Sequence, residues 1–490
     1  MPDSATLEIH ELNVGQGDSI LILNRDLAAV RKKIVAKKGE PAAAALAPID
    51  YMPYAIANDV ALAGTVRKAL LVDGGDDEYG GDVLGYLEMH GVLAPGTVYT
   101  PNLSLLVSHY HDDHMAGLRS IFKERVDPTR KGEKVTYRER YRPGDVYMTL
   151  GNKKADPSTQ RFGLFGKDVT SATGTFTNPT RRHNLGPGGV DAQGATTRIE
   201  LGTGVDGIAI GLYAIAAAQS VFSRTTGGPV AVVSKGKKAD QNDRSIVLVL
   251  EYGSFRYFVG GDIGGNGKNG GGNFGTNGMD TAGKKFFSGH ADVESKLGPA
   301  LEAFFPGTTA WKAGQPKYPN AGYCTAVKAN HHGSSSSVDV YSLATMRPCV
   351  AVISSGVKAR FHRHPTQQVM DRMSNTPRWP LRGKTRTTTT PNTIVQVYLT
   401  EVAAQVKGKV FPVDLRGGRI VGDIILRPVD ESVAAVQAST AAGTPLRVQV
   451  YGTGAQTGLA DPTSVLRPTV ARNAARANYP IGPWIHQDTH

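Results

Sequence analysis

Short hydrophobic runs that end in polar residues recur along this chain. Runs that alternate, or are continuously apolar in the manner of buried strands, predict strands at 7–12, 19–23, 68–72, 103–108, 245–252, 255–259 and 350–354. The apolar spacing of other stretches is typical of helices: 82–90, 115–123 and 293–305. Strands and helices mixed in this way predict an α/β architecture.

Several predicted strands are followed directly by residues that can act as acids, bases or metal ligands. Asp73 follows the third run, residues 109–114 follow the fourth, and Asp262 follows the run at 255–259. His331 and His332 follow a short apolar segment that ends at Ala329. Because functional side chains collect at strand ends in α/β sheets, we expect a site where these ends meet.

Residues 109–114, His-Tyr-His-Asp-Asp-His, give the clearest chemical signal. In an extended segment, side chains two residues apart point to the same side, so His109 and His111 are predicted to bind one ion. Asp113 and His114, at the turn into a helix, can face a second ion. Imidazole and carboxylate ligands suit zinc, and also manganese. The alternative interpretation is a solvated, histidine-rich loop.

The H-x-H-x-D-H pattern after a buried strand resembles the metallo-β-lactamase superfamily, and within it the ComEC-type hydrolases of the DNA-uptake family. Further segments resemble that family in its own order: 13–19 (NVGQGDS), 72–75 (VDGG), 242–248 (NDRSIVL), 260–262 (GGD), 331–334 (HHGS), and 353–356 (ISSG) with His364-Pro365. The chain departs from the family where Asn13 replaces aspartate, Gly260 replaces threonine and Arg363 replaces glycine. The family's membrane channel and oligonucleotide-binding domain have no visible counterpart, so transport is not implied.

The resemblance implies an αββα sandwich with large insertions and a β-rich C-terminal extension. We expect a hydrolase domain over 1–380, with insertions at about 30–63, 124–241 and 264–283. The extension and tail would occupy 381–490, and the tail is a candidate arm for a protein partner.

The resemblance also assigns roles. One or two divalent metal ions, zinc or manganese, are expected on His109, His111, Asp113, His114, Asp262 and His331. The expected catalytic residues are Asp113, His332 and His364, although the sequence does not decide which of the adjacent His331 and His332 binds metal. Asp18 and Asp73 are expected to orient ligands. Ser334 either caps a helix or contacts substrate phosphate. Asp262 in isolation could equally be a turn residue, and nothing around His183 suits a further ligand.

Charge and cysteine content narrow the classes of function. Lys and Arg number 55 against 43 Asp and Glu, for a net charge of +12, which favours a polyanionic substrate. Two basic segments, 125–142 with Arg138, Arg140 and Arg142, and 372–386 with Trp379, could bind a phosphate backbone and stack bases, or could simply be solvated. With two cysteines outside any C-x-x-C pair, no apolar run of membrane-spanning length and no signal-like start, we expect a cytoplasmic protein.

The combined prediction is a metal-dependent phosphodiesterase, in particular a nuclease that cleaves DNA with a metal-bound hydroxide. Two alternatives stay open. One is hydrolysis of a small cyclic nucleotide or another ester, in a pocket enclosed by the insertion at 124–241. The other is a non-hydrolytic binding subunit.

Overall fold

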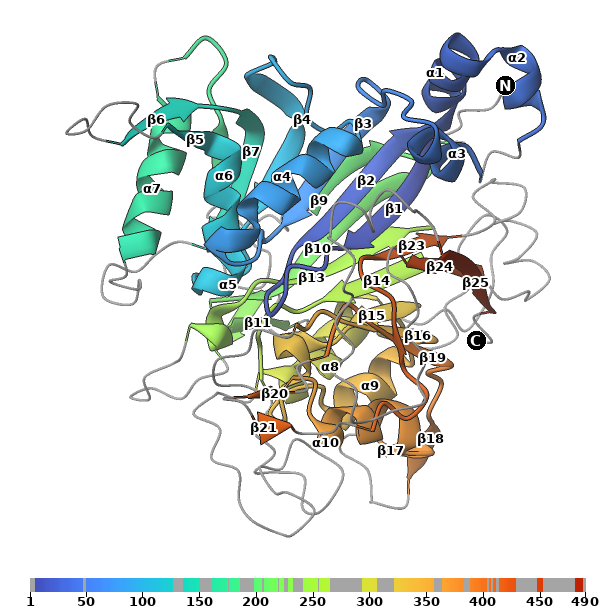
Figure 1. Ribbon diagram of the computed structural model, residues 1–490. Helices are drawn as coiled ribbons and strands as arrows, with labels where there is room; N and C mark the ends of the chain where they lie inside the picture. Colours follow the sequence, from blue (N-terminus) through green and yellow to red (C-terminus); the bar gives the residue numbers. More distant parts are fainter. Residues whose placement is uncertain are drawn as a thin grey trace.

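Two large β-sheets pack face to face, and helices cover both outer faces (Figure 1). The computed structural model describes residues 5–46, 50–126, 135–149, 160–174, 176–185, 198–204, 207–218, 220–223, 228–231, 241–253, 255–264, 293–305, 321–356, 364–381, 388–402, 405–406, 409–410, 414–428, 447–452 and 481–487.

The first sheet has the strand order β25-β24-β23-β1-β2-β3-β4-β7-β8. Its strands are β1 (Ala5–Glu11), β2 (Ile20–Asp26), β3 (Val66–Val72), β4 (Tyr99–Leu106), β7 (Arg142–Thr149), β8 (Arg181–Leu185), β23 (Ile424–Pro428), β24 (Arg447–Gly452) and β25 (Ile481–Gln487). Strands β3, β4, β7 and β8 are parallel, so their carboxyl ends share one edge of the sheet.

The second sheet has the order β12-β11-β10-β13-β14-β15-β16-β19-β22, and β9 also pairs with β10. Its strands are β9 (Arg198–Thr203), β10 (Ala209–Ala217), β11 (Ser220–Ser223), β12 (Gly228–Ala231), β13 (Val247–Tyr252), β14 (Phe255–Val259), β15 (Ala326–Lys328), β16 (Val350–Ile353), β19 (Gln396–Leu399) and β22 (Arg419–Ile420). Its strands β14, β15, β16, β19 and β22 are parallel. Small two-stranded pairs join β5 (Lys123–Val126) with β6 (Thr136–Glu139), β17 (Arg378–Pro380) with β18 (Thr389–Pro391), and β20 (Gln405–Val406) with β21 (Lys409–Val410).

Helices form the two outer layers. They are α1 (Leu27–Lys38), α2 (Glu40–Ala44), α3 (Tyr51–Ala57), α4 (Gly80–Met89), α5 (Asp112–Met115), α6 (Arg119–Phe122), α7 (Gln160–Ala172), α8 (Glu294–Phe304), α9 (Val340–Met346) and α10 (Gln367–Met370). Short 3-10 turns are η2 (Asp77–Tyr79), η3 (Ala116–Leu118), η6 (Asn242–Arg244) and η7 (Asn330–Gly333), and η8 (Asp371–Asn375) is a π-helical turn.

Side-chain alternation along the strands divides the core into layers. Ile9 of β1 packs between the sheets with Leu248 of β13, whereas Leu71 of β3 packs outward in the cluster that contains α4. Val327 of β15 packs outward in the cluster that contains α8 and α9. Because each strand buries alternate residues on opposite faces, both faces of each sheet need a cover. The predicted αββα sandwich is confirmed.

Segments expected to be insertions also form regular structure. Residues 30–63 fold mainly into α1 to α3, while the stretch 124–241 supplies β7 to the first sheet and β10 to the second. Residues 265–283 of the third segment lie outside the described part. In the C-terminal extension, β19 and β22 lengthen the second sheet and β23 to β25 lengthen the first. A domain boundary at 380 stays a prediction, as does a partner for the tail.

Close backbone packing joins the loops at the sheet edge. Asp18 N donates to Asp113 O at 3.2 Å, so the loop between β1 and β2 lies on the turn that begins α5. A Cβ at Gly17 would lie 2.5 Å from the same Asp113 oxygen, and a Cβ at Gly356 would lie 2.1 Å from the carbonyl carbon of Gly15. Glycine is required at Gly17 and Gly356 because any side chain there would collide with backbone.

Candidate metal centre

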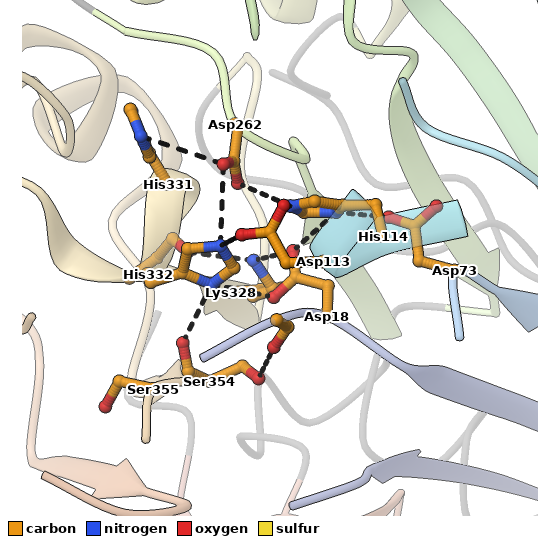
Figure 2. Close-up of polar contacts among 12 residues, drawn as sticks. Asp18, Asp73, Asp113, His114, Asp262, Lys328, His331, His332, Ser354 and Ser355 are labelled. Atoms are coloured by element: carbon orange, nitrogen blue, oxygen red, sulfur yellow. Dashed lines mark hydrogen bonds and ion pairs between the residues drawn. The ribbon is translucent and has the colours of Figure 1, made fainter. Parts of the chain in front are cut away.

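Four side chains from three separate segments of the chain converge at the edge where the two sheets meet (Figure 2). They belong to Asp113, His114, Asp262 and His332, and one ligand atom of each lies within 4.8 Å of the others. His114 Nε2 is 3.3 Å from Asp262 Oδ1. His332 Nε2 is 3.4 Å from Asp262 Oδ2 and 3.6 Å from Asp113 Oδ2. The Asp262 carboxylate is therefore the centre of the cluster.

His109 and His111 lie beside this group and face each other, as their spacing predicts. His109 Nε2 is 3.1 Å from His111 Nδ1 and 4.0 Å from Asp262 Oδ2. His109 is buried, whereas His111 is partly exposed. The two sides of the cluster thus share Asp262.

Asp73 orients the ring of His114. At the end of β3, Asp73 Oδ1 accepts from Ser108 N at 2.7 Å, and Oδ2 accepts from Ser108 Oγ at 2.5 Å. His114 Nδ1 donates to Asp73 Oδ2 at 2.8 Å. With Nδ1 held by a carboxylate, Nε2 of His114 is directed toward Asp262. This arrangement is the one by which outer carboxylates orient ligand histidines in metal sites.

His331 and His332 occupy a turn after β15 in which both residues have left-handed backbone angles, with φ of 49° and 52°. Such angles are unfavourable for side chains with a Cβ and persist only where neighbours hold them. His331 N donates to Gly261 O at 3.0 Å. Glu294 holds the other side of the turn, because its carboxylate accepts a hydrogen bond from the Asn330 side chain.

The turn sends the two rings in different directions. His332 enters the group of four, and its Nδ1 lies 3.1 Å from Ser354 O and 3.3 Å from Asp18 Oδ1. His331 is more exposed, and its Nε2 lies 3.7 Å from Asp262 Oδ2. The geometry thus distinguishes the two histidines where the sequence did not.

Asp18 lies beneath the cluster and is almost completely buried. Its Oδ2 is 2.6 Å from Lys328 Nζ and 3.8 Å from His114 Nδ1. Lys328, Ser108 and Glu294 were missed by the sequence reasoning. A lysine at the end of an apolar strand, four residues before His332, was the available signal for the first of them.

The other predicted residues lie at different distances from the cluster. The His364 ring centroid is 5.8 Å from that of His331 and 6.3 Å from that of His332, so His364 borders the site. Ser334 follows the histidine turn, and its Oγ lies 3.2 Å from Ser336 Oγ. His183 pairs with Asp145 at 2.7 Å on β7, and is not one of the clustered residues.

The three predicted substrate-binding arginines lie away from the cluster. Arg142 pairs in register with Tyr99, the first residue of β4, whereas the histidine segment follows the other end of that strand. Arg142 Nε is 2.9 Å from Glu139 Oε1. Arg138 and Arg140 both form ion pairs with Glu124. These arginines are therefore at the opposite end of β4 and carry acidic partners.

Two residues of the second basic segment, Arg372 and Trp379, have structural roles, contrary to expectation. The Arg372 guanidinium is buried and donates to Ser335 O at 2.8 Å. Trp379 is fully buried, and its Nε1 donates to Arg372 O at 3.0 Å. Since neither side chain is accessible, stacking of bases on Trp379 is excluded. Residues 382–386 of this segment lie outside the described part.

Charges within the cluster are strongly coupled. Burial raises the pKa of the Asp262 carboxyl, but His332, His114 and His331 outweigh burial and bring that pKa well below its usual value. Burial lowers the pKa of His332, but Asp262 and Asp18 outweigh it and raise that pKa well above the usual value. Carboxylates thus create a negative potential at buried imidazoles, and the same potential favours a metal cation.

Buried polar atoms test whether a metal ion suits these residues. Within the described residues, His114 Nε2, His332 Nε2 and Asp262 Oδ1 are buried without a hydrogen-bonding partner. Such atoms are costly unless something binds them. Two imidazole nitrogens and two carboxylates form a donor set that suits zinc or manganese. The cluster is therefore able to hold a divalent metal ion.

Comparisons with known proteins give little further guidance. No protein-family model matches the chain, and no curated protein matches it. Among solved structures, the chain is similar to Zn(2+)-bound PqqB from Methylobacterium extorquens, with 10% sequence identity and a TM-score of 0.20. The match covers 39% of this chain and 48% of that one, about half of its length. Function is therefore inferred from the residues of the cluster themselves. Among the described helices, none is long and apolar enough to cross a membrane.

Proposed function

We propose that this protein is a metal-dependent hydrolase whose principal ion is held by Asp113, His114, Asp262 and His332. The observation that carries this proposal is the convergence of these four side chains from three separate segments of the chain. Their buried atoms that lack a hydrogen bond support it further. His332 replaces His331 as the proposed ligand because its Nε2 faces both Asp113 and Asp262.

A second ion would be held by His109 and His111, with Asp262 shared between the two positions. The support is the short separation of the His109 and His111 nitrogens and the position of Asp262 beside them. His331, on the same side of the Asp262 carboxylate, is the proposed third histidine of this position or a substrate contact. If the two metal ions are lost one at a time, the two positions can be distinguished.

When bound, a divalent ion would polarise a phosphoryl oxygen and lower the pKa of a water molecule. The chain's own residues bind the ion and orient the substrate. Asp113 and His331, with side chains 31% and 15% exposed, border the accessible side of the cluster. His364, near both histidines of the turn, is the proposed proton donor to the leaving oxygen. Ser334 is proposed to donate a hydrogen bond to substrate phosphate.

The proposed substrate is a phosphodiester, and DNA is favoured. The ordered resemblance of the segments from 13 to 365 to ComEC-type hydrolases supports this choice, as does the net charge of +12. A small ester or cyclic nucleotide is the second candidate, because the arginines expected to follow a nucleic-acid backbone lie at the far end of β4. A reducing compartment such as the cytoplasm suits Cys324 and Cys349, which are buried free thiols.

Metal analysis and a substrate panel test the proposal. Purified protein would be assayed for bound zinc and manganese, then incubated with single-stranded DNA, double-stranded DNA, RNA and a chromogenic phosphodiester. We expect bound metal, and cleavage that chelation abolishes and metal restores. The matched control is His183→Ala, since that histidine pairs with Asp145 and is not one of the four clustered residues. Metal binding without hydrolysis of any substrate would favour the binding-subunit alternative. Absence of metal binding would refute the proposal.

A further inference from the structure

Lys328 is a charged residue within the apolar interior between the two sheets. In β15, Val327 points outward into the helix-covered core, whereas Ala326 points into the core between the sheets. Side chains alternate along a strand, so Lys328 points inward with Ala326. The lysine is 1% exposed. A buried ammonium group is unfavourable unless opposite charge compensates it.

Two buried carboxyl groups surround this ammonium group. Lys328 Nζ lies 2.6 Å from Asp18 Oδ2 and donates to Ala329 O at 3.1 Å. Glu11, at the end of β1, is a second buried carboxyl group near Lys328, and it accepts a hydrogen bond from the Tyr257 hydroxyl. Burial lowers the pKa of Lys328, but the neighbouring carboxyl groups, Asp18 first, outweigh it, so the group is positively charged in the folded protein.

Asp18 connects Lys328 with the candidate metal centre. While Oδ2 faces Lys328, Oδ1 lies 3.3 Å from His332 Nδ1. The Ser354 carbonyl lies on the same nitrogen of His332 at 3.1 Å. Both neighbours of Nδ1 are acceptors, so Nδ1 carries a proton and the ring is held with Nε2 directed at Asp262 and Asp113.

We propose that Lys328 is a positioning residue, which fixes the Asp18 carboxylate and, through it, the orientation of the His332 ring. The proposal rests on the assignment of His332 as a metal ligand, but it concerns the side chains beneath that ligand. Without the ammonium group, the Asp18 carboxylate would lose its fixed partner and could turn away from His332. Carboxylates in this outer position change metal affinity by about 10- to 100-fold when removed.

The test uses the full chain and three variants: Lys328→Met, Asp18→Asn and the double variant. Zinc affinity is measured by competition with a chromogenic chelator, and the surroundings of His332 Nδ1–H by its resonance in NMR of ¹⁵N-histidine-labelled, metal-free samples. We expect Lys328→Met and Asp18→Asn each to weaken zinc binding about 10- to 100-fold and to shift the His332 Nδ1–H resonance. The double variant should be no weaker than Asp18→Asn, because Lys328 acts through Asp18.

Glu11→Gln is the matched control, because it replaces the other buried carboxyl group near Lys328 without a contact to His332. We expect the wild-type His332 Nδ1–H resonance in this variant. If Lys328→Met does not fold, comparing the zinc affinity of Asp18→Asn with that of the charge-neutral double variant still tests the proposal. A further loss of zinc affinity in the double variant would overturn it. An unchanged His332 Nδ1–H resonance in folded Lys328→Met would also overturn it. The resonance is read without metal or substrate, so a failure of the proposed hydrolase activity is seen separately, as zinc binding without turnover.

Discussion

Replacing Asp73 by asparagine should weaken metal binding by reversing the tautomer of His114. Asp73 Oδ1 accepts from Ser108 N at 2.7 Å, so the amide oxygen of asparagine must occupy that position. The amide nitrogen then faces His114 Nδ1, 2.8 Å away in the wild-type protein. Two donors cannot pair, and His114 must therefore carry its proton on Nε2.

The tautomer change gives the magnitude of the effect. His114 Nε2 lies 3.3 Å from Asp262 Oδ1, so its proton would be stabilised there and would block the atom proposed to bind metal. We expect a loss of about 10- to 100-fold in zinc affinity, equivalent to about 1.4 to 2.8 kcal/mol. The size of asparagine matches that of aspartate, so packing around Ser108 should be preserved.

Zinc titration calorimetry on wild-type protein and Asp73→Asn measures the change directly. Asp77→Asn is the control, because Asp77 is exposed in the turn that follows the same strand. Its zinc affinity should equal that of the wild type. If Asp73→Asn binds zinc within about twofold of wild type, the orientation of His114 does not depend on this carboxylate. The tautomer argument would then be wrong.

Three further predictions concern charge. Asp262→Asn should lower turnover by at least about a hundredfold, because the shared carboxylate loses its charge; near-normal rates at saturating metal would make Asp262 a turn residue only. Burial raises the pKa of Glu11 from 4.5 to about 8, so the folded chain holds this proton where the unfolded chain releases it, and urea-unfolding free energy should fall by up to about 1.4 kcal/mol per pH unit across that interval. Glu11→Gln should lack this slope, and equal slopes in both proteins would contradict the assignment. Alanine at Arg138, Arg140 and Arg142 should flatten the salt dependence of binding to long single-stranded DNA but leave hydrolysis of a small phosphodiester unchanged, since the three arginines lie away from the cluster; parallel losses on both substrates would show that they are structural.

The sequence determined the layers and the chemistry of the cluster, because both depend on local pattern. The alternation in β1 and the continuous apolar runs of β4 and β16 predicted strands that the structure contains. The spacing of His109 and His111 correctly placed their rings together, since side chains two residues apart in an extended segment share a side. Residue types alone indicated metal ligands.

Tertiary structure decided which residues act together. His331 and His332 are equivalent in the sequence. Only their left-handed turn, in which His331 N contacts Gly261 O and His332 Nδ1 contacts Ser354 O, sends the His332 ring into the cluster. Trp379 looked available for stacking but is buried, because its neighbours in the chain form the small pair β17–β18 beside α9.

Tertiary structure also decides which residues Lys328 and the arginines contact. Lys328 meets Asp18, more than three hundred positions earlier in the chain, only because β15 and the loop after β1 face each other across the two sheets. Arg142 follows the histidine segment closely in the chain, yet the parallel register of β7 with β4 returns it to the opposite end of the sheet. Local pattern fixes what a residue can do, but strand order and register fix what it meets.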